Sequence, residues 1–423
     1  MDVLVAGGGI AGLSVALTCQ QIGVAAQILE AAPELRPLGL GINLQPSAVR
    51  ELHEVGLESE LAAISVPVRE FVLAGRDGVV VVREPRGTDA GSPWPQLSVT
   101  RGDLEMVLHR AVLDRLGSNT IATGHRVVGY EHEVGAVRAV VDHDGATQRR
   151  DSTVLVGADG LHSAVRAQMF PGEGGPRWGG AVLWRGVASG PPIRDGASFV
   201  VVGDERQRFM TFPISAPDPD TGEQLHNWIA QLAFDASRGW RRGDWNTRVE
   251  ATEFVGAYAG WTFDWIDVPG LVERSADVFE YPMVDRDPAP RWLHGSVVLV
   301  GDAAHPMYPL GSNGASQAIV DARVLGAAFV DHGVGRGALS AYQAARLDEL
   351  TAAVVRNRRA GPFSVLGTVD EQCAAAFDHI GAETTAEELA ACVTRYESSS
   401  RAAIEALAAT SPTIATGARV AAG

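Results

Sequence analysis

The chain has 423 residues, of which 46% are hydrophobic and 20% charged, and its formal net charge is −16. This length exceeds what one hydrophobic core usually serves, so two domains are expected. The acidic excess, with arginine as the basic residue at all 35 Lys and Arg positions, argues against nucleic acid or an anionic membrane as partner. Three cysteines without disulfide or metal spacing, and no apolar run of membrane-spanning length, predict a soluble cytoplasmic protein without a bound metal.

The first thirty residues have the pattern of a βαβ nucleotide-binding unit. Residues 2–6 are short, apolar and β-branched, as in a strand buried on both faces, and a helix-like stretch and a second strand follow. Gly7 would make the turn, Gly9 would let the backbone approach a pyrophosphate, and Gly12 would let helix and strand pack closely. Glu30 ends the second strand, where a carboxylate can accept a hydrogen bond from a ribose hydroxyl.

Regular βα alternation stops after Glu30. A glycine-punctuated loop occupies residues 36–46, and a hairpin pattern covers 69–82. An amphipathic helix capped by Thr100 is expected within 98–117. Short strands are expected between 119 and 156, before a buried strand and turn at 154–166.

The middle of the chain differs from the preceding residues in composition and in sequence pattern. Eight of the nine tryptophans fall between Trp178 and Trp292, among strand-like runs at 181–188, 197–203 and 227–235. This pattern predicts a mostly antiparallel sheet that carries a pocket, although any single tryptophan is more often part of the core. Shorter helices are expected near 246–259 and 263–267.

Residues 299–323 combine a strand, Asp302, a loop rich in small residues and proline, and a helix that begins near Asn313. The first amides of a helix lack internal partners and carry the positive end of the helix dipole, so this stretch predicts a site for an electron-rich group. Long helices are expected at 313–331 and 337–360, and a helical tail at 384–408.

Three motifs stand in order along the chain: GGGIAG followed by Glu30, GADGLHSAVR at 157–166, and GDAAHPMYPLGSNGASQAIVDA at 301–322. Together they resemble the single-component FAD-dependent aromatic hydroxylases, the family of p-hydroxybenzoate and salicylate hydroxylases. The third motif, with RPLGLGIN and YPMVDRDP, is most similar to the branch that contains the pyocyanin-forming phenazine monooxygenase. The resemblance covers about residues 1–360.

The resemblance implies an α/β fold with a discontinuous Rossmann-like FAD-binding domain of the GR2 type. That domain is expected to comprise residues 1–70, 98–170 and 277–375. A substrate domain built on a mostly antiparallel sheet is expected from 71–97 and 171–276, followed by a C-terminal helical tail at 376–423.

The resemblance also implies roles for individual residues. Those expected to bind FAD are Gly7, Gly9, Ile10, Ala11, Gly12, Glu30, Arg36, Gly41, Arg101, Asp159, Arg166, Asp302, Gly311, Ser312, Asn313 and Gly314. Those expected to shape the flavin environment and the reaction pocket are His305, Pro309 and Gly311, with a structural role in the turn as the alternative for His305. Those expected to face the substrate are Trp184, Arg185, Met210, Phe212, Trp228, Tyr308 and Pro309, although a register slip of one residue would turn a strand residue away.

The implied reaction inserts one atom of O₂ into an aromatic or heteroaromatic ring through a flavin C4a-(hydro)peroxide, with NADH or NADPH as reductant. No acid/base triad is expected, because the cofactor carries the chemistry. A counterpart of the arginine–tyrosine pair that binds a benzoate carboxylate is not evident, so a carboxylated benzoate is not supported as substrate. The tryptophan-rich middle region suits a larger polycyclic or heteroaromatic secondary metabolite. The protein is expected to be a monomer or a homodimer. Baeyer–Villiger oxidation, epoxidation, flavin oxidoreduction without oxygenation, and redox sensing through a bound partner are the alternatives.

Overall fold

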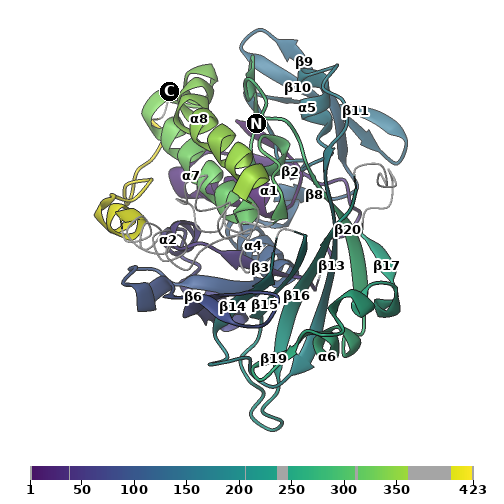
Figure 1. Cartoon of the computed structure of the whole chain (residues 1–423). Helices are drawn as coiled ribbons and strands as arrows, with labels where there is room; N and C mark the ends of the chain where they lie inside the picture. The colour runs from purple at the N-terminus through teal and green to yellow at the C-terminus, as the bar shows by residue number, and fades with distance from the viewer. Residues whose placement is uncertain are drawn as a thin grey trace.

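The computed structural model describes residues 2–37, 39–204, 206–235, 246–309, 313–360 and 402–421. Two large sheets organise these residues. A parallel sheet with helices packed against it lies in the upper part of Figure 1, and an antiparallel sheet lies below it. The mixed α/β architecture predicted from the sequence is confirmed.

The first sheet has six strands in the order β21–β22–β12–β1–β2–β8. All neighbours pair in parallel except the edge strand β21, which is antiparallel to β22. Its central strands are apolar and buried on both faces, as parallel strands covered by helices must be. The strand bounds are β1 Val3–Ala6, β2 Ala26–Leu29, β8 Ile121–Ala122, β12 Val154–Gly157, β21 Leu293–His294 and β22 Val297–Leu299.

Helix α1 (Ile10–Ile22) lies between this sheet and helix α7 (Gly314–His332), and it is buried on nearly every side. Helix α8 (Arg336–Ala360) packs on α7, and α4 (Arg101–Leu116) packs on α1. The hydroxyl of Thr100 accepts a hydrogen bond from the amide of Asp103, which confirms the predicted N-cap of α4. Four shorter helices have the bounds α2 Pro46–Glu54, α3 Glu58–Ile64, α5 Ala164–Met169 and α6 Val268–Glu273.

The second large sheet has eight strands in the order β17–β20–β13–β16–β15–β14–β5–β6. Each pair of neighbours is antiparallel except β14 and β5, which are parallel. The boundaries between the FAD-binding and substrate domains, which were predicted from the sequence, remain a prediction. The strand bounds are β5 Glu70–Ala74, β6 Val80–Pro85, β13 Arg177–Gly190, β14 Ser198–Gly203, β15 Gln207–Pro213, β16 Gln224–Ala233, β17 Thr247–Val249 and β20 Val278–Asp285.

Three small sheets complete the strands that the described residues form. Their orders are β3–β7–β4, β11–β10–β9 and β18–β19. The bounds are β3 Gly41–Leu44, β4 Ser65–Val68, β7 Gln96–Thr100, β9 Arg126–Glu133, β10 Ala136–His143, β11 Ala146–Ser152, β18 Thr262–Phe263 and β19 Ile266–Asp267. The helix expected at 263–267 was wrong, because Phe263 and Ile266 pair across a tight turn. The helix expected at 246–259 is β17 followed by two short 3₁₀ turns.

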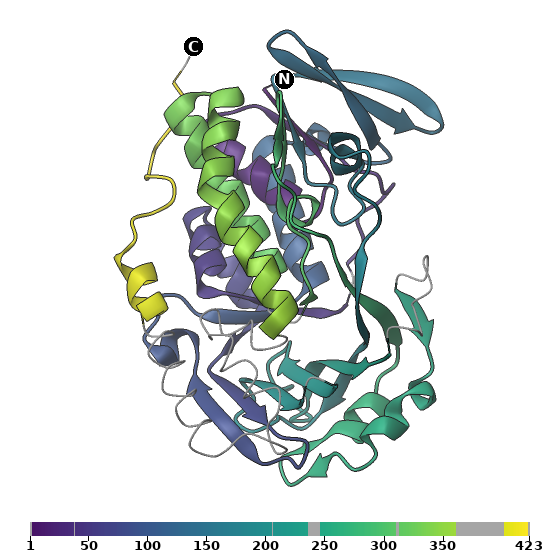
Figure 2. The same cartoon turned by 45° about the horizontal axis from the view of Figure 1, so that its top comes forward.

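The described part of the tail runs along the outer side of the helices, drawn in yellow in Figure 2. Residues 402–409 are helical, and the side chain of Ile414, beyond them, is buried in the main core. Within the described ranges, no helix is long and apolar enough to cross a membrane.

Candidate functional site

The carboxyl ends of β1, β2, β12 and β22 meet along one edge of the parallel sheet, which is where α/β folds bind their ligands. The turn after β1 is closely packed there. Gly7 has a φ of +106°, and a Cβ on it would lie 2.5 Å from the carbonyl oxygen of Ala158. A Cβ on Gly12 would lie 2.0 Å from the carbonyl oxygen of Gly7, so α1 can approach β1 only because this side chain is absent. Beside Gly9, in contrast, the described atoms leave the Cβ position open.

One cavity, of about 610 Å³, adjoins this turn, and we call it the turn cavity. Its lining includes the ends of β1, β2 and β12, Arg101 and Glu105 on α4, and the first residues of β9. Glu30 is one of the residues that line this cavity. One carboxylate oxygen of Glu30 accepts from the amide of Gly8 at 2.6 Å, and the other accepts from the amide of Ala32 at 2.6 Å. These bonds hold an acceptor group at the cavity wall.

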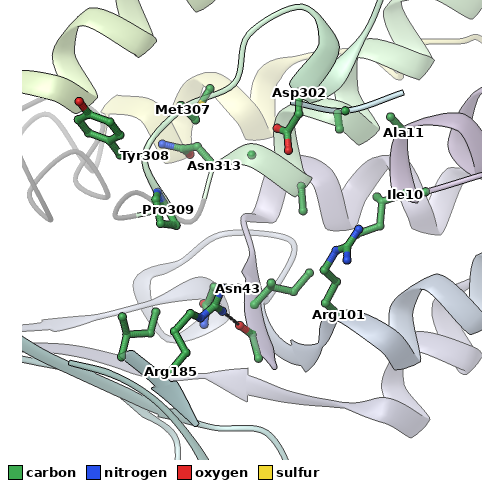
Figure 3. Close-up of a pocket in the computed structure, with 18 of the residues that line it drawn as sticks. Ile10, Ala11, Asn43, Arg101, Arg185, Asp302, Met307, Tyr308, Pro309 and Asn313 are labelled. Carbon is green, nitrogen blue, oxygen red and sulfur yellow. Dashed lines mark hydrogen bonds between the residues drawn. The ribbon is translucent and has the colours of Figure 1, made fainter. Parts of the chain in front are cut away.

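A second cavity, of about 280 Å³, lies between the start of α7 and the eight-stranded sheet, and we call it the sheet cavity. Gly9, Arg101, Ala158 and Gly160 line both cavities, so the two form one elongated site. Figure 3 shows Arg101 rising from the first residue of α4 toward Ile10. Its guanidinium lies 3.6 Å from the carboxylate of Glu105 one helical turn later.

Asp302 follows β22 and faces the sheet cavity together with the first residues of α7, Asn313 and Gly314 (Figure 3). The side chain is open to the cavity, yet protein surrounds it, and this burial raises the pKa of the Asp302 carboxyl. His305 and Arg101 oppose the rise electrostatically. The site therefore presents a carboxylate acceptor to the cavity.

The floor of the sheet cavity is one face of the eight-stranded sheet. Arg185 on β13 pairs in register with Ile229 on β16, and Ile229 pairs with Met210 on β15, so these side chains form a row. Phe199 and Phe212 stack in the neighbouring row with ring centroids 5.2 Å apart. All five line the cavity, as do Met307, Tyr308 and Pro309 on the facing loop. Burial raises the pKa of the Tyr308 hydroxyl to about 12, so this group stays protonated.

Arg185 and Asn227 hold Gly41, the first residue of β3, against the eight-stranded sheet. A terminal nitrogen of Arg185 donates to the carbonyl oxygen of Gly41 at 2.8 Å (Figure 3). The amide of Gly41 donates to the side-chain oxygen of Asn227 at 2.7 Å. A Cβ on Gly41 would lie 2.5 Å from the Cβ of Asn227, so glycine is required for this contact.

Two residues expected to face the substrate do not reach the cavity. Trp184 and Trp228 lie on the opposite face of the eight-stranded sheet, in a separate buried cluster. Trp184 stacks on Phe254 at 4.5 Å, and the indole N–H of Trp228 donates to the hydroxyl of Ser275 at 2.7 Å. Alternate residues of a strand point to opposite faces, so the inward position of Arg185 directs Trp184 outward.

His305, expected to shape the reaction pocket, is also away from the cavity. Its ring is 2% exposed, lies against Trp292, and contacts the carboxylate of Asp321 on α7 at 2.5 Å. Asp321 also accepts from the amide of Gly301 at 3.0 Å and pairs with Arg346 on α8 at 3.0 Å. The histidine therefore fastens the turn after β22 to the helices behind it.

Arg166 was expected, as part of the cofactor site, to anchor the turn at 157–166, and its guanidinium is 1% exposed and bonded to protein groups. It donates to the carbonyl oxygens of Ala303, Ala304 and Asp287 and pairs with Glu173. Its role is to join the turn at 157–166 to the turn after β22.

The other expected residues lie as follows. Asp159 lines the turn cavity while its carboxylate accepts from the amides of Ala164 and Val165 at the start of α5. Arg36 lines the turn cavity, not the sheet cavity, and is paired with Glu34 on the surface. Gly311 and Ser312 lie outside the described residues.

Phe199, Ile229 and Met307 line the sheet cavity and were not predicted as substrate-facing. The signal that could have found the first two is cross-strand register with Phe212 and Met210, and register is not readable from one sequence. Among the described residues, no group of three or more His, Cys, Asp or Glu side chains is arranged to hold a metal ion.

The arrangement fits an extended dinucleotide. The space beside Gly9, the acceptor at Glu30, the cation at Arg101 and the acceptor at Asp302 follow one another through both cavities. The start of α7 and the apolar sheet face then enclose the inner end. Fold and site together fit an α/β protein that binds a dinucleotide at the edge of its parallel sheet and has an apolar chamber at the inner end of the site.

The comparisons with known proteins agree. The FAD binding domain family matches residues 1–357. The phenazine 1,6-dicarboxylic acid hydroxylase of Lysobacter antibioticus is 41% identical over 362 residues, which cover 84% of this chain and 89% of that protein. The aurachin C monooxygenase/isomerase of Stigmatella aurantiaca is 31% identical over 369 residues, which cover 85% of this chain and 89% of that protein.

Solved structures share the fold. Klebsiella pneumoniae HpxO, complexed with FAD and uric acid, superposes with a TM-score of 0.72 at 22% identity and covers 96% of this chain and 95% of its own. A salicylate hydroxylase substrate complex gives a TM-score of 0.70 at 20% identity, with 96% and 98% covered. The chain belongs to the FAD binding domain family and is an FAD-dependent aromatic monooxygenase.

Proposed function

We propose that the protein uses NADH or NADPH, FAD and O₂ to insert one oxygen atom into a polycyclic aromatic or heteroaromatic secondary metabolite. The observation that carries the proposal is the continuity of the two cavities through Gly9, Arg101, Ala158 and Gly160. This continuity allows a flavin ring to enter the same apolar chamber as the substrate. The chemistry that bound FAD supplies is electron transfer from NAD(P)H and activation of O₂.

The turn cavity would hold the adenosine and pyrophosphate end of FAD. The open backbone at Gly9 lets phosphates approach the first amides of α1, Glu30 accepts from a ribose hydroxyl, and Arg101 reaches the phosphate region. Asp302 would accept from ribityl hydroxyls between the two cavities.

The start of α7 would lie against the pyrimidine edge of the ring system. Asn313, the residue before the helix, makes no side-chain cap, so the first amides of α7 are available for an acceptor. Oriented amides and a helix dipole stabilise negative charge that develops during reduction, and they do so more strongly where water is scarce.

The sheet cavity supports an aromatic substrate. The stacked rings of Phe199 and Phe212 offer a flat apolar surface, and Tyr308 and Pro309 close the opposite side. These walls exclude water from the reacting ring. That a 41% identical relative is named a phenazine 1,6-dicarboxylic acid hydroxylase supports a polycyclic substrate in particular.

The test is turnover of FAD-loaded protein under ¹⁸O₂ with NADH and with NADPH, in the presence of phenazine-1,6-dicarboxylate and a panel of other polycyclic aromatics. A product that carries one ¹⁸O atom on a ring carbon is expected, with reductant consumption that depends on the aromatic. Reductant oxidation without any oxygenated product across the panel would contradict the proposal and favour a plain oxidoreductase. Oxygen found in a ring-expanded lactone or an epoxide would instead establish the Baeyer–Villiger or epoxidising alternative.

A further inference from the structure

Helix α8 carries a row of buried side chains along one of its faces. These residues recur every three or four positions, which places them above one another on the helix. In Figure 2 the yellow-green helix α8 runs from the region of the chain ends down toward the eight-stranded sheet. The row consists of Tyr342, Arg346, Leu350, Val354 and Asn357, each of which is at most 5% exposed.

The two ends of this row bond to different parts of the molecule. Near the start of the helix, the hydroxyl of Tyr342 donates to the carbonyl oxygen of Leu299, the last residue of β22, at 3.3 Å. Near its end, the side-chain amide of Asn357 donates to the carbonyl oxygen of Tyr308 at 2.9 Å. Tyr308 and Pro309 line the sheet cavity. A helix that is anchored on the parallel sheet therefore also holds the loop that faces the cavity floor.

Arg358 fixes the end of α8 to the eight-stranded sheet. Its Nε and one terminal nitrogen donate to the two carboxylate oxygens of Asp285 at 2.5 and 3.0 Å, and the other terminal nitrogen donates to Asp287 at 2.8 Å. Asp285 is the last residue of β20 and is 0% exposed. A bidentate pair of this kind has a defined geometry, which a single exposed ion pair lacks. The helix end is therefore held at a fixed position relative to the strands of the cavity floor.

The cavity wall that Asn357 holds has few other polar attachments. Within the described ranges, residues 306–309 make no hydrogen bond besides the one from Asn357. Pro309 has no amide hydrogen with which to make one. The wall otherwise depends on packing: a Cβ on Gly179 of β13 would lie 2.6 Å from the hydroxyl oxygen of Tyr308, so the tyrosine fits where the strand has no side chain.

We propose that Asn357 is a positioning residue, which holds Pro309 against the aromatic substrate through the carbonyl group of Tyr308, while Arg358 fixes the helix end that carries it. The proposal rests on the proposed function, because it concerns a wall of the same cavity. With the wall in place, the substrate ring is held closely and water is excluded from it. With the wall displaced, NAD(P)H, a proton and O₂ would more often yield NAD(P)⁺ and hydrogen peroxide, with no oxygen transferred to the ring.

The test uses Asn357→Leu, which removes the donor at nearly constant volume, in the FAD-loaded protein. In calorimetric titration with phenazine-1,6-dicarboxylate, the Kd is expected to rise about threefold to tenfold, the usual effect of losing one hydrogen bond. During turnover, the ratio of oxygenated product to NAD(P)H consumed is expected to fall, with hydrogen peroxide accounting for the difference. The affinity for FAD is expected to stay unchanged, because the turn cavity and Asp302 keep their contacts.

A second variant, Arg358→Gln, releases the end of α8 from β20 and is expected to change the Kd and the product ratio in the same direction. Arg358→Lys keeps the charge without the bidentate fork and should restore part of the loss. The matched control is Arg356→Gln, because Arg356 lies on the same turn of α8 and is exposed. Both quantities are expected to keep their wild-type values in this control.

A wild-type Kd and product ratio in both Asn357→Leu and Arg358→Gln, with only a lower Tm, would overturn the proposal and assign both residues to stability alone. If Asn357→Leu does not fold, Arg358→Gln decides, because the Arg358 side chain is 23% exposed and its loss disturbs the core less. A wild type that binds the ligand and forms no oxygenated product would contradict the proposed function. In that case the Kd values of the variants alone decide this inference.

Discussion

The two cavities of the site are built in different ways. The turn after β1, beside the turn cavity, is shaped by backbone: Gly7 and Gly12 lie where a Cβ would collide with backbone atoms, and Gly9 and Glu30 fall within the same first thirty residues. The floor of the sheet cavity is made by side chains from β13, β14, β15 and β16, which their register brings onto one face. A site built from glycines and backbone suits one ligand common to a whole family. A cavity lined by side chains can change its ligand specificity through single substitutions.

The largest expected effect distinguishes Gly12 from Gly9, the two glycines at the start of α1. In Gly12→Ala the new Cβ meets the backbone oxygen of Gly7 at 2.0 Å, so we expect destabilisation of the apoprotein by about 3 kcal/mol or more and loss of FAD binding. In Gly9→Ala the Cβ enters open space and φ is −76°, so we expect an unchanged apoprotein Tm but weaker FAD binding. Thermal unfolding and fluorescence titration of FAD measure the two effects. A Gly9→Ala protein with wild-type FAD affinity would remove this position from the site.

The second largest effect is expected for Asp321, a buried carboxylate on α7. Asp321→Asn removes the buried anion that contacts His305 and pairs with Arg346, and leaves Arg346 only the exposed Glu349, so we expect a loss of about 3 kcal/mol in unfolding free energy at neutral pH. Burial by itself would raise the pKa of Asp321, but His305 and Arg346 outweigh it and hold that pKa below its ordinary value. A lowered pKa contributes stability above the ordinary aspartate pKa of about 3.9, so the difference from wild type should shrink as the pH falls below that value.

Urea unfolding at several pH values measures this dependence. The control is Asp348→Asn, because Asp348 is exposed on α8. An equal loss in both variants would mean that the network around Asp321 adds nothing specific.

A smaller effect distinguishes the two faces of the eight-stranded sheet. Trp228→Phe removes buried volume from the face away from the cavity, so we expect about 1 to 3 kcal/mol of destabilisation and unchanged ligand affinity. Met210→Leu nearly conserves volume and should cost less than about 1.5 kcal/mol, but it changes the cavity floor and should alter ligand affinity or the position oxygenated. Calorimetry with phenazine-1,6-dicarboxylate and product analysis measure both. If ligand affinity changes in Trp228→Phe and not in Met210→Leu, the cavity lies on the other face of the sheet, contrary to the assignment made here.

The smallest expected effect on stability concerns Asp302, in the wall of the sheet cavity. Because burial raises the pKa of this carboxyl, the charged form is disfavoured in the folded state, and the associated stability is present in acid and lost as the pH rises. Asp302→Asn should therefore raise the Tm of the apoprotein slightly near neutral pH and leave it unchanged in acid. The same substitution should weaken FAD binding by about tenfold or more through loss of a charged acceptor. A lower apoprotein Tm together with unchanged FAD affinity would contradict both roles.

The contrast between the cavities also explains what could be predicted from the sequence. Gly7, Gly9, Gly12 and Glu30 act through local spacing in a single βαβ unit, and the strand, helix and turn expected there are all present. The long helices α7 and α8 and the cap at Thr100 are likewise local patterns.

Residues whose role depends on distant partners were harder to place. His305 finds its partner on α7, and Arg166 finds carbonyl groups more than a hundred residues away. For Trp184 and Arg185, adjacent in the chain, the choice of the inward residue is set by pairing with β16 and β20. Residue type alone favoured both, and strand alternation allows only one.

The claim that the two cavities form one site is tested most directly by the absorption spectrum of bound flavin during titration with phenazine-1,6-dicarboxylate. A ligand in the sheet cavity would lie against the flavin ring, so a saturable change of the flavin band is expected, with the same Kd as the calorimetric titration. Binding that calorimetry detects while the flavin spectrum stays unchanged would place the ligand elsewhere and contradict the account.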